Sequence, residues 1–90
     1  MYCMWYYVYI LESLKDGKRY IGFTTNFKKR FEEHQKGLSP STKPRLPMKP
    51  IYIELCTDEE DARRREIYLK STGGHRYLAK RLKSYYKSKL

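Results

Sequence analysis

The segment YYVYILESLKDGKRYIG, residues 6–22, decides the fold of this chain. It holds two apolar, tyrosine-rich runs on either side of a short polar break, and runs of aromatic and β-branched residues favour β-strands. The break contains Asp16 and Gly17, a dipeptide that suits the positive φ angles of a tight hairpin turn. The segment therefore predicts two antiparallel strands, at residues 5–11 and 19–24, joined by a two-residue turn.

The expected turn also determines which side chains share a face of the sheet. With the Asp-Gly dipeptide at its centre, the turn pairs Lys15 with Lys18. Tyr9, Tyr20 and Gly22 then lie on one face. This register leaves the two tyrosines two side-chain rows, roughly 14 Å, apart. A site that uses both hydroxyls would need a bulge, a strong twist or a looser loop.

A helix and a loop are predicted after the second strand. Thr25 or Asn26 is a suitable N-cap, the segment FKKRFEEHQK places its phenylalanines four residues apart, and Gly37 is a good C-terminal stop. This pattern is typical of a short amphipathic helix. Residues 37–50 then contain four prolines together with basic residues. They predict an extended loop, either a stiff connection or a basic rim beside a substrate groove.

The remainder of the chain predicts a third strand and two helices. The segment IYIELC, residues 51–56, resembles the first two strands in composition. A capping box of Thr57 and Glu60, with acidic residues in the first turn, begins a helix that runs to about Lys70. The glycine pair at 73–74 is expected to break this helix, and a basic helix follows.

Length and composition limit the chain to one small fold. A chain of 90 residues supports one modest core. Apolar residues make up 40% and aromatic residues 16%, which is enough packing material for a globular chain. No repeat or boundary is visible, so we expect residues 1–90 to form a single domain. Its predicted class is α+β: a small three-stranded antiparallel sheet flanked by helices, in the order β-β-α-β-α-α.

Positive charge is concentrated in the last third of the chain. The formal net charge is +10, and residues 63–90 hold ten Lys/Arg against Glu66 alone, whereas residues 1–62 hold ten against nine acidic residues. Such a block indicates a polyanion partner, most often nucleic acid. A merely solvated helix face and an anionic membrane surface are the weaker alternatives. The candidate nucleic-acid-binding residues are Lys43, Arg45, Arg76, Lys80, Arg81, Lys83 and Lys87.

The apolar opening, MYCMWYYVYIL, is expected to belong to the fold. It lacks a basic leader and a small-residue cleavage site, and it is too short to span a bilayer. Cys3 and Cys56 lie far apart with no zinc-type spacing to His34 or His75. They are typical of reduced cysteines, so we expect a cytoplasmic protein with no membrane partner.

Two polar residues of the first predicted helix, Arg30 and His34, lie one turn apart at the edge of its phenylalanine stripe. They are therefore expected where the core-facing surface meets solvent. A salt bridge with Glu33 would explain Arg30, and a partly buried ring bonded to backbone would explain His34. Taken singly, each residue needs no functional explanation.

Glu66 is the most unusual residue of the second predicted helix. It falls at nearly the same helical angle as Ala62 and Leu69, which should face the sheet, and an inward carboxylate needs a partner. The partner could be Lys70, four residues on, in a routine surface ion pair. A groove-facing Glu66 could instead hold a divalent cation.

Taken in order, these residues resemble the GIY-YIG nuclease superfamily, in particular its small single-domain bacterial members. The triplets VYI at 8–10 and YIG at 20–22 stand for the two signature elements. The segments RFEEH and RREIYLK supply the expected arginine, histidine and glutamate. The likeness covers residues 5–83 and extends to the N-terminal nuclease domain of the excinuclease C subunit. It implies a three-stranded sheet flanked by helices and metal-dependent hydrolysis of phosphodiester bonds, mostly in DNA.

The resemblance also implies a role for each matching residue. Tyr9 or Tyr20 would help to deprotonate the attacking water. Arg30 would stabilise charge on the scissile phosphate, since its guanidinium binds phosphate in a planar, bidentate way. His34 would assist proton transfer, and Glu66 would bind Mg²⁺ or Mn²⁺. A tyrosine has an ordinary pKa near 10, so a tyrosine base needs a neighbouring cation or metal-bound water.

Three further positions bear on this resemblance. Gly22 weakens a strand interior, which indicates a bulge or a close approach to the backbone, and the resemblance implies that it leaves room for the substrate backbone. The first triplet begins with Val8 in place of glycine. Many members carry a C-terminal asparagine, whereas this chain has none after Asn26.

The expected function is therefore that of a small Mg²⁺-dependent DNA endonuclease, structure-directed and acting in DNA repair or recombination. RNA is the alternative nucleic-acid partner. A second hypothesis is a catalytically weak nucleic-acid-binding protein that keeps the fold, and its binding should fall steeply with salt. A third is a module that docks its basic helix on an acidic protein. The sequence leaves the oligomeric state open.

Overall fold

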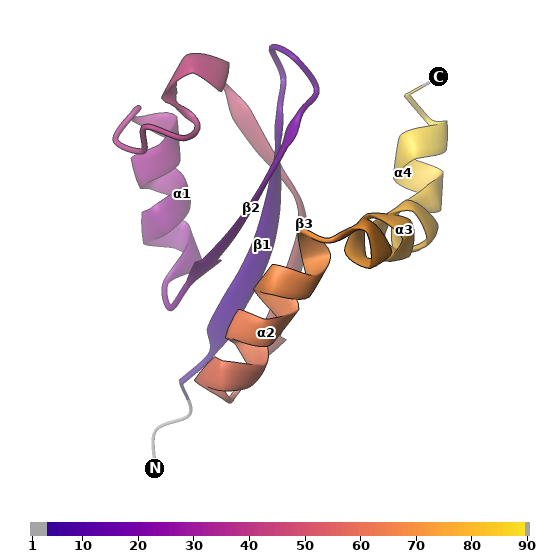
Figure 1. Cartoon of the computed structure of the whole chain (residues 1–90). Helices are drawn as coiled ribbons and strands as arrows, with labels where there is room; N and C mark the ends of the chain where they lie inside the picture. Colours follow the sequence, from indigo (N-terminus) through magenta and orange to yellow (C-terminus); the bar gives the residue numbers. More distant parts are fainter. Residues whose placement is uncertain (1–3, 90) are drawn as a thin grey trace.

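The computed structural model describes residues 4–89 as a three-stranded sheet with helices on both faces (Figure 1). Its order confirms the predicted β-β-α-β-α-α arrangement, with one short helix added at the end. The elements are β1 (Tyr6–Ser13), β2 (Arg19–Thr24), α1 (Phe27–Gln35), a 3-10 turn (Lys43–Arg45), β3 (Met48–Cys56), α2 (Glu59–Leu69), α3 (Thr72–Arg81) and α4 (Lys83–Lys87).

The first strand is the centre of the sheet. The strand order is β2-β1-β3, and β1 is antiparallel to both neighbours. Because side chains alternate along a strand, β1 sends its even residues to one face and its odd residues to the other. Residues Val8 to Ser13 are all buried, so both faces of β1 are covered.

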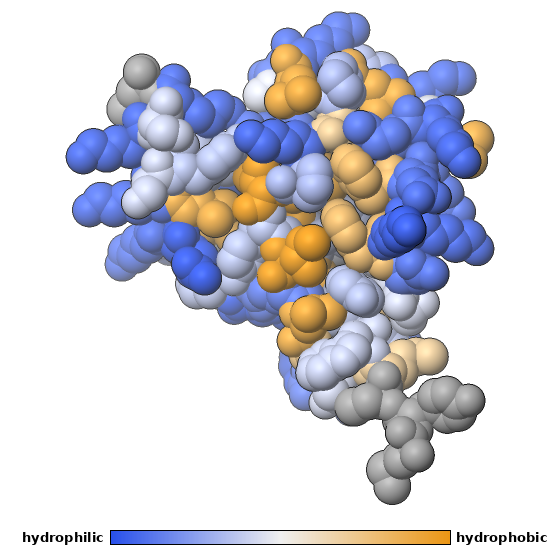
Figure 2. Space-filling model, turned by 180° about the vertical axis from the view of Figure 1, so that it is seen from behind, coloured by the Kyte–Doolittle hydropathy of each residue, from blue (hydrophilic) through white to orange (hydrophobic). Residues whose placement is uncertain are grey.

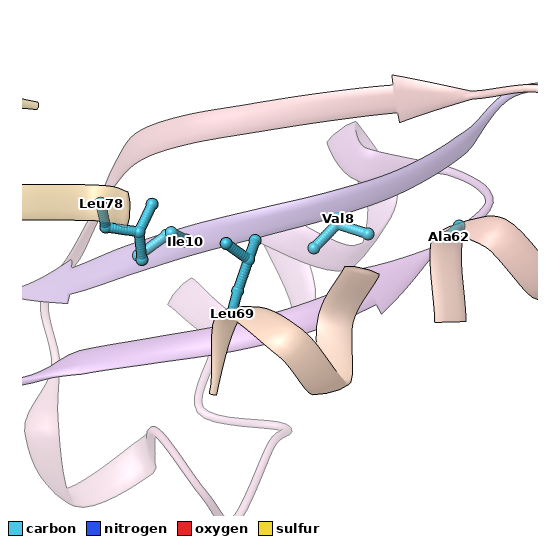
Figure 3. Packing of buried hydrophobic residues seen from close by; sticks show 5 residues of the cluster. All are labelled: Val8, Ile10, Ala62, Leu69 and Leu78. Carbon is cyan, nitrogen blue, oxygen red and sulfur yellow. The ribbon is translucent and has the colours of Figure 1, made fainter. Parts of the chain in front are cut away.

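The face with the even residues carries an apolar core. Val8 and Ile10 pack against Ala62 and Leu69 of α2 and against Leu78 of α3, and all five are buried (Figure 3). Burying an aliphatic side chain of this size contributes about 1.5–3 kcal/mol. This cluster therefore holds α2 and α3 on the sheet.

The face with the odd residues packs against α1. Tyr9, Leu11 and Met48 are buried here, with Phe27 and Phe31 of α1 packed against them. The two phenylalanine rings stack with centroids 5.8 Å apart. The predicted amphipathic helix is confirmed, and Asn26, one of its two predicted N-caps, accepts a hydrogen bond from the Lys29 amide.

A β-bulge lets one strand serve both faces. In the β1–β3 pair Ile10 lies opposite Tyr52 and Leu11 lies opposite Pro50, so β3 has one extra residue at this point. The extra residue reverses the alternation of β3. Met48 consequently points toward α1, and the strand begins three residues before the predicted start at residue 51.

The hairpin loop is longer than predicted. Ser13 and Lys18 close it through a hydrogen bond of 2.9 Å between the Ser13 amide and the Lys18 carbonyl, so four residues form the loop. The Ser13 hydroxyl accepts hydrogen bonds from the amides of Lys15 and Asp16. Gly17 has a φ of 73°, which favours glycine. The two-residue turn was wrong because the Ser13 side chain stabilises a wider loop.

The N-cap of α2 also differs from the prediction. Asp58, and not Thr57, accepts the hydrogen bond of the cap, from the amide of Asp61. The capping box with Glu60 was therefore wrong by one residue. The three acidic residues of the first turn still complement the helix dipole.

The glycine pair at 73–74 begins a helix and does not end one. The break falls at Ser71, whose hydroxyl accepts a hydrogen bond from the Gly74 amide as the N-cap of α3. A Cβ at Gly74 would lie 2.1 Å from the carbonyl oxygen of Tyr68. The glycine therefore lets α3 start directly against the end of α2, which sequence propensity alone did not indicate.

The predicted basic C-terminal helix is divided at Leu82 into α3 and α4. A buried carboxylate of β1 anchors α4: Glu12 accepts a hydrogen bond of 2.6 Å from the Tyr85 hydroxyl and pairs with Lys89. Burial opposes ionisation, yet the hydrogen bonds from Lys89 and Tyr85 hold the pKa of Glu12 below its ordinary value.

Not every apolar side chain is covered. Ile53 and Leu55 of β3 pair with Tyr9 and Tyr7, so they point to the α1 side of the sheet, and both are exposed. The view from behind shows hydrophobic residues through the middle of the molecule, with hydrophilic residues around them (Figure 2). Helix α1 therefore leaves β3 open on this face.

Two remaining expectations concern the start of the chain and its cysteines. Tyr6 begins β1, so the apolar opening from that residue onward belongs to the sheet as predicted. Among residues 4–89, no helix is long and apolar enough to cross a bilayer. Cys56 is half-buried at the end of β3, and Cys3 lies outside the described residues.

Candidate active site

The observed register brings the two signature tyrosines together. Tyr9 lies directly opposite Gly22, and Tyr20 lies opposite Leu11 in the neighbouring position. The Tyr9 and Tyr20 rings are 6.2 Å apart between centroids. The shared face was predicted correctly, whereas the separation of roughly 14 Å was wrong. The longer loop shifts β2 by two residues along β1, which preserves the face and shortens the distance.

Gly22 makes room for a side chain of the protein itself. A Cβ at this position would lie 2.5 Å from both Cζ and Oη of Tyr9, and 2.9 Å from Cε1 of Tyr20. The Tyr9 ring therefore lies across Gly22, as the direct cross-strand pairing requires. We expected this glycine to leave room for a substrate backbone, but the close approach seen here is that of the Tyr9 phenol.

His34 is held between two hydroxyl groups. Its Nε2 is 2.9 Å from the Tyr9 hydroxyl, and its Nδ1 is 2.7 Å from the Thr42 hydroxyl. All three residues are almost completely buried, with exposed fractions of 1% for Tyr9 and 0% for His34 and Thr42. The alternative of a partly buried ring bonded to backbone was wrong, because both ring nitrogens bond to side chains.

Burial determines where the protons lie in this cluster. Burial, followed by the neighbouring Tyr20, raises the pKa of Tyr9 to about 12. Burial, followed by the charge of Arg30, lowers the pKa of His34. At neutral pH the phenol is thus protonated and the imidazole is uncharged. The simplest arrangement has the Tyr9 hydroxyl donating to Nε2 while Nδ1–H donates to the Thr42 oxygen.

Arg30 lies at the open edge of the cluster. Its guanidinium pairs with Glu33 at 3.2 Å and donates a hydrogen bond of 3.4 Å to the Ser39 hydroxyl. The predicted salt bridge with Glu33 is thus confirmed. Arg30 also acts on the buried pair, since its charge opposes the rise in the Tyr9 pKa. Its side chain is 31% exposed, so an anion from solvent can reach it.

Glu66 approaches the cluster from α2. Its side chain is only 16% exposed, and its Oε2 is 3.1 Å from Nζ of Lys70. The expected surface pair with Lys70 is confirmed. The carboxylate is also close enough to Tyr9 for its negative charge to raise the pKa of that phenol. Glu66 thus has the lysine partner expected from the sequence, and its negative charge also acts on Tyr9, whereas the binding of a divalent cation by Glu66 stays a prediction.

An open hollow of about 420 Å³ lies next to these residues. Tyr20 and Ile21 of β2, Ser41 of the loop after α1, and Lys70 at the end of α2 are part of its lining. Arg19 and His75 complete the lining. The hollow thus joins the tyrosine cluster to the end of α2 that carries Glu66.

A divalent cation would find one carboxylate at this site. Among residues 4–89 there is no group of three or more His, Cys, Asp or Glu side chains that could hold a metal ion. Mg²⁺ usually keeps several water molecules and binds through one or two carboxylates together with substrate phosphates. A lone, nearly buried Glu66 fits that mode of binding and does not fit a cage made of protein ligands alone.

The basic residues expected to bind nucleic acid occupy three places. Lys43 and Arg45 lie in the 3-10 turn, where Arg45 is 3.8 Å from Asp16 of the hairpin. Arg76 and Lys80 line a second hollow, of about 490 Å³, together with Tyr68 and Tyr77. The others are on the C-terminal helices: Arg81 ends α3, and Lys83 and Lys87 bound α4. Their contact with nucleic acid stays a prediction.

Sequence reasoning missed several neighbours of the candidate site. Thr42 and Ser39 come from the proline-rich loop, and no local pattern separates a buried hydroxyl there from an exposed one. Ser41 and His75 are near the tyrosines only because the loop and α3 fold toward β2. One hint was present in the sequence. A histidine ring near the core needs a hydrogen-bond partner for each of its two nitrogens, so His34 required partners that the sequence did not identify.

This arrangement of two tyrosines, an arginine, a histidine and a helical glutamate defines a known class of catalytic domain. The chain belongs to the GIY-YIG family: the model of the GIY-YIG catalytic domain matches residues 5–77. Membership supports a nuclease-type function, with nucleic acid as the substrate in general.

The relatives are small proteins of bacteria. A UPF0213 protein of Clostridium perfringens is 40% identical over 65 residues, which cover 71% of this chain and 69% of the relative. A UPF0213 protein of Streptococcus pneumoniae is also 40% identical over 65 residues, covering 71% and 65%. The solution NMR structure of a UPF0213 protein from Bacillus halodurans has 34% identity and a TM-score of 0.54, covering 86% of this chain and 84% of that one.

Proposed function

We propose that this protein is a metal-dependent DNA endonuclease that hydrolyses phosphodiester bonds. One observation carries the proposal: Tyr9, Tyr20, Arg30 and His34, which are widely spaced in the sequence, cluster on one face, and the charge of Glu66 reaches the same phenol. A purely structural role would not require the arginine and the glutamate to act on one buried tyrosine.

Arg30 is the residue that binds the scissile phosphate. Hydrolysis adds negative charge to the phosphoryl oxygens, and preorganised donors aimed at that charge lower the barrier. The guanidinium is partly exposed and is held by Glu33 and Ser39 on one side, which orients it without covering it. Its permanent charge makes this contact independent of pH in the working range.

Tyr9 and His34 act as a pair in proton transfer. The Tyr9 oxygen takes a proton from the attacking water while its own proton passes to Nε2 of the uncharged His34. Tyr9 is therefore a neutral phenol before and after the transfer, and the positive charge appears on His34, where Glu33 favours it and Arg30 opposes it. Tyr20, which lines the hollow, orients the substrate beside this pair.

Glu66 is the residue that would hold Mg²⁺ or Mn²⁺. When bound, such an ion supplies Lewis-acid stabilisation of phosphate charge and lowers the pKa of bound water. The near burial of the Glu66 carboxylate strengthens its attraction for a cation. The substrate phosphate and water complete the ligand set in this proposal.

Cleavage of plasmid and branched DNA, with and without Mg²⁺, tests the proposal. We expect Glu66→Gln and Tyr9→Phe each to lower the rate by about 10²–10⁴-fold, and Tyr20→Phe to have a smaller effect. Glu60→Gln, a change at an exposed residue in the first turn of α2, is the matched control for Glu66→Gln and should cleave normally. Equal nicking by all variants would mean that the activity is contamination and that the site is wrongly assigned.

A nucleic-acid-binding protein that does not cleave is the second candidate. It is favoured by the complete burial of His34 and by the Lys70 ammonium that already occupies the Glu66 carboxylate. This candidate predicts binding to DNA or RNA that weakens steeply with salt, and no Mg²⁺-dependent product on plasmid, branched DNA or RNA. Comparing affinity for branched and linear DNA in the same assay also tests whether recognition is structure-directed, as a role in repair or recombination would require.

A further inference from the structure

Lys70 connects the candidate metal ligand to the neighbouring hollow. Its Nζ is 3.1 Å from Oε2 of Glu66, and its side chain is 53% exposed whereas that of Glu66 is 16% exposed. An exposed ammonium thus covers a nearly buried carboxylate. Ion pairs four residues apart at a helix surface are weak and open readily, so Lys70 is free to exchange partners.

The hollow beside Lys70 has the chemistry of an anion site. Arg19, Lys70 and His75 supply nitrogen donors, while Tyr20 and Ser41 supply hydroxyl groups. Within residues 4–89, no carboxylate belongs to the lining, although the Glu66 carboxylate is in contact with Lys70. A volume of about 420 Å³ admits a phosphodiester group with its water. The residues come from β2, the loop after α1, α2 and α3, so the fold assembles them from four parts of the chain.

We propose that this hollow holds a backbone phosphate adjacent to the cleaved one, and that Lys70 alternates between Glu66 and that phosphate. This inference rests on the proposed nuclease function, because it assigns the neighbouring subsite of the same groove. In the free protein, Lys70 neutralises Glu66. When a divalent cation occupies the carboxylate, Lys70 turns to the phosphate.

The exchange follows from electrostatics. Two cations at one carboxylate repel each other, so binding of a divalent ion weakens the Glu66–Lys70 pair. A phosphate in the hollow attracts the released ammonium. Linkage makes the effect reciprocal: a phosphate that draws Lys70 away from Glu66 also tightens the binding of the cation there. Lys70 therefore couples metal binding to nucleic-acid binding.

A simple surface pair makes a different prediction for DNA. If Lys70 only pairs with Glu66, its replacement would still free the carboxylate for a cation but would leave the salt slope of DNA binding unchanged. In the proposed role, the same replacement removes a competitor from Glu66 and a contact from the phosphate. The two affinities must then change in opposite directions.

The experiment measures binding with Lys70→Met and requires no cleavage. Mn²⁺ is titrated into ¹⁵N-labelled protein, and paramagnetic broadening of the Glu66 amide signal reports occupancy. We expect the half-broadening concentration to fall about five-fold, in line with removal of the nearby Lys70 charge, whose side chain is 53% exposed. Fluorescence anisotropy with a labelled DNA duplex in saturating Ca²⁺, which occupies the carboxylate so that Lys70 is released, should show affinity about ten-fold weaker at low salt, with a salt slope smaller by about 0.9.

Lys28→Met, on the exposed side of α1, is the matched control for net charge. It should leave both the Mn²⁺ titration and the salt slope unchanged. The proposal is overturned if Lys70→Met weakens Mn²⁺ binding or leaves it unchanged, if its salt slope equals that of the wild type, or if Lys28→Met produces the same changes. Because nothing here depends on turnover, a protein that never cleaves DNA can still pass or fail this test.

Discussion

The two faces of the sheet use the same central strand in different ways. On the α2 side, Val8 and Ile10 are sealed by aliphatic side chains. On the α1 side, Tyr9 is just as deeply buried, but it bonds to His34, whose other nitrogen bonds to Thr42. One face supplies stability by excluding water. The other holds polar groups away from water, which keeps Tyr9 protonated and His34 uncharged at neutral pH.

A chain of 90 residues can thus carry a candidate site and an apolar core on opposite faces of one strand. Because side chains alternate along β1, the apolar core and the polar cluster lie on opposite faces of the sheet. The bulge in β3 turns Met48 toward the α1 side, where it packs with Tyr9 and Leu11. A change within the apolar cluster of the α2 face should therefore alter folding alone, whereas a change in the Tyr9–His34–Thr42 cluster should alter both folding and titration.

The largest effect is expected from Leu69→Ala on the apolar face. Deleting a fully buried leucine leaves a cavity and costs about 2–5 kcal/mol of the free energy of unfolding. Urea unfolding followed by circular dichroism measures this loss. The fraction that remains folded should keep the Tyr9 and His34 titrations of the wild type. An altered His34 pKa in this variant would show that the faces are not independent.

Gly22→Ala should break the polar face. The new methyl group would lie 2.5 Å from the Tyr9 ring, which must move away from His34, at an expected cost of about 1–3 kcal/mol. The NMR signal of the Tyr9 hydroxyl or of the His34 ring should shift, and cleavage should be lost. Gly17→Asn, at a glycine of positive φ in the hairpin loop, should leave the Tyr9–His34 contact unchanged, since no atom of the described residues lies within 4 Å of a Cβ there.

Thr42→Val keeps the shape of a buried side chain and removes its hydroxyl. The Nδ1–H group of His34 then loses its acceptor, which costs about 1–3 kcal/mol. Thr42→Ser retains the hydroxyl and should recover the wild-type ring signals. We expect ¹⁵N spectra of the imidazole to show a changed tautomer balance in the valine variant. Identical ring spectra in the two variants would contradict the assigned hydrogen bond.

The smallest expected effect is the dependence of stability on pH through His34. Burial lowers the pKa of this residue in the folded state, so below about pH 6.5 the unfolded chain binds a proton that the folded protein does not. Stability must then fall as the pH falls, by at most about 1.4 kcal/mol per unit. Urea unfolding at pH 7.5 and 5.5 measures the difference, and His34→Gln should flatten it. A flat wild-type profile would contradict a neutral buried imidazole.

Much of the fold was predictable because its signals are local. Alternating aromatic and β-branched residues located all three strands, and the phenylalanine spacing between Asn26 and Gly37 located α1. The errors were at the ends of secondary-structure elements, where one side chain or one glycine outweighs the local secondary-structure propensity. Ser13 widened the hairpin, and Gly74 moved the start of α3. Neither effect can be read from composition.

The candidate site was only partly predictable. The alternation of side chains along the strands placed Tyr9, Tyr20 and Gly22 on one face. The spacing of helical residues placed Arg30 and His34 one turn apart. The distances depended on the loop length, so the expected separation of the tyrosines was wrong. Residues that approach from elsewhere, such as Thr42 and Ser41, carried no recognisable signal.

The order of the elements, the alternation of β1 and the residue types of the site follow from periodicity and side-chain chemistry, so the sequence alone specifies them. The contacts depend on the tertiary structure. Tyr9 crosses Gly22 to reach His34, and the second ring nitrogen of His34 bonds to Thr42. Lys70 likewise lies between Glu66 and an open hollow. Those contacts join segments far apart in the chain. Their geometry depends on register, loop length and the packing of α1 and α2 on opposite faces, which no local pattern specifies.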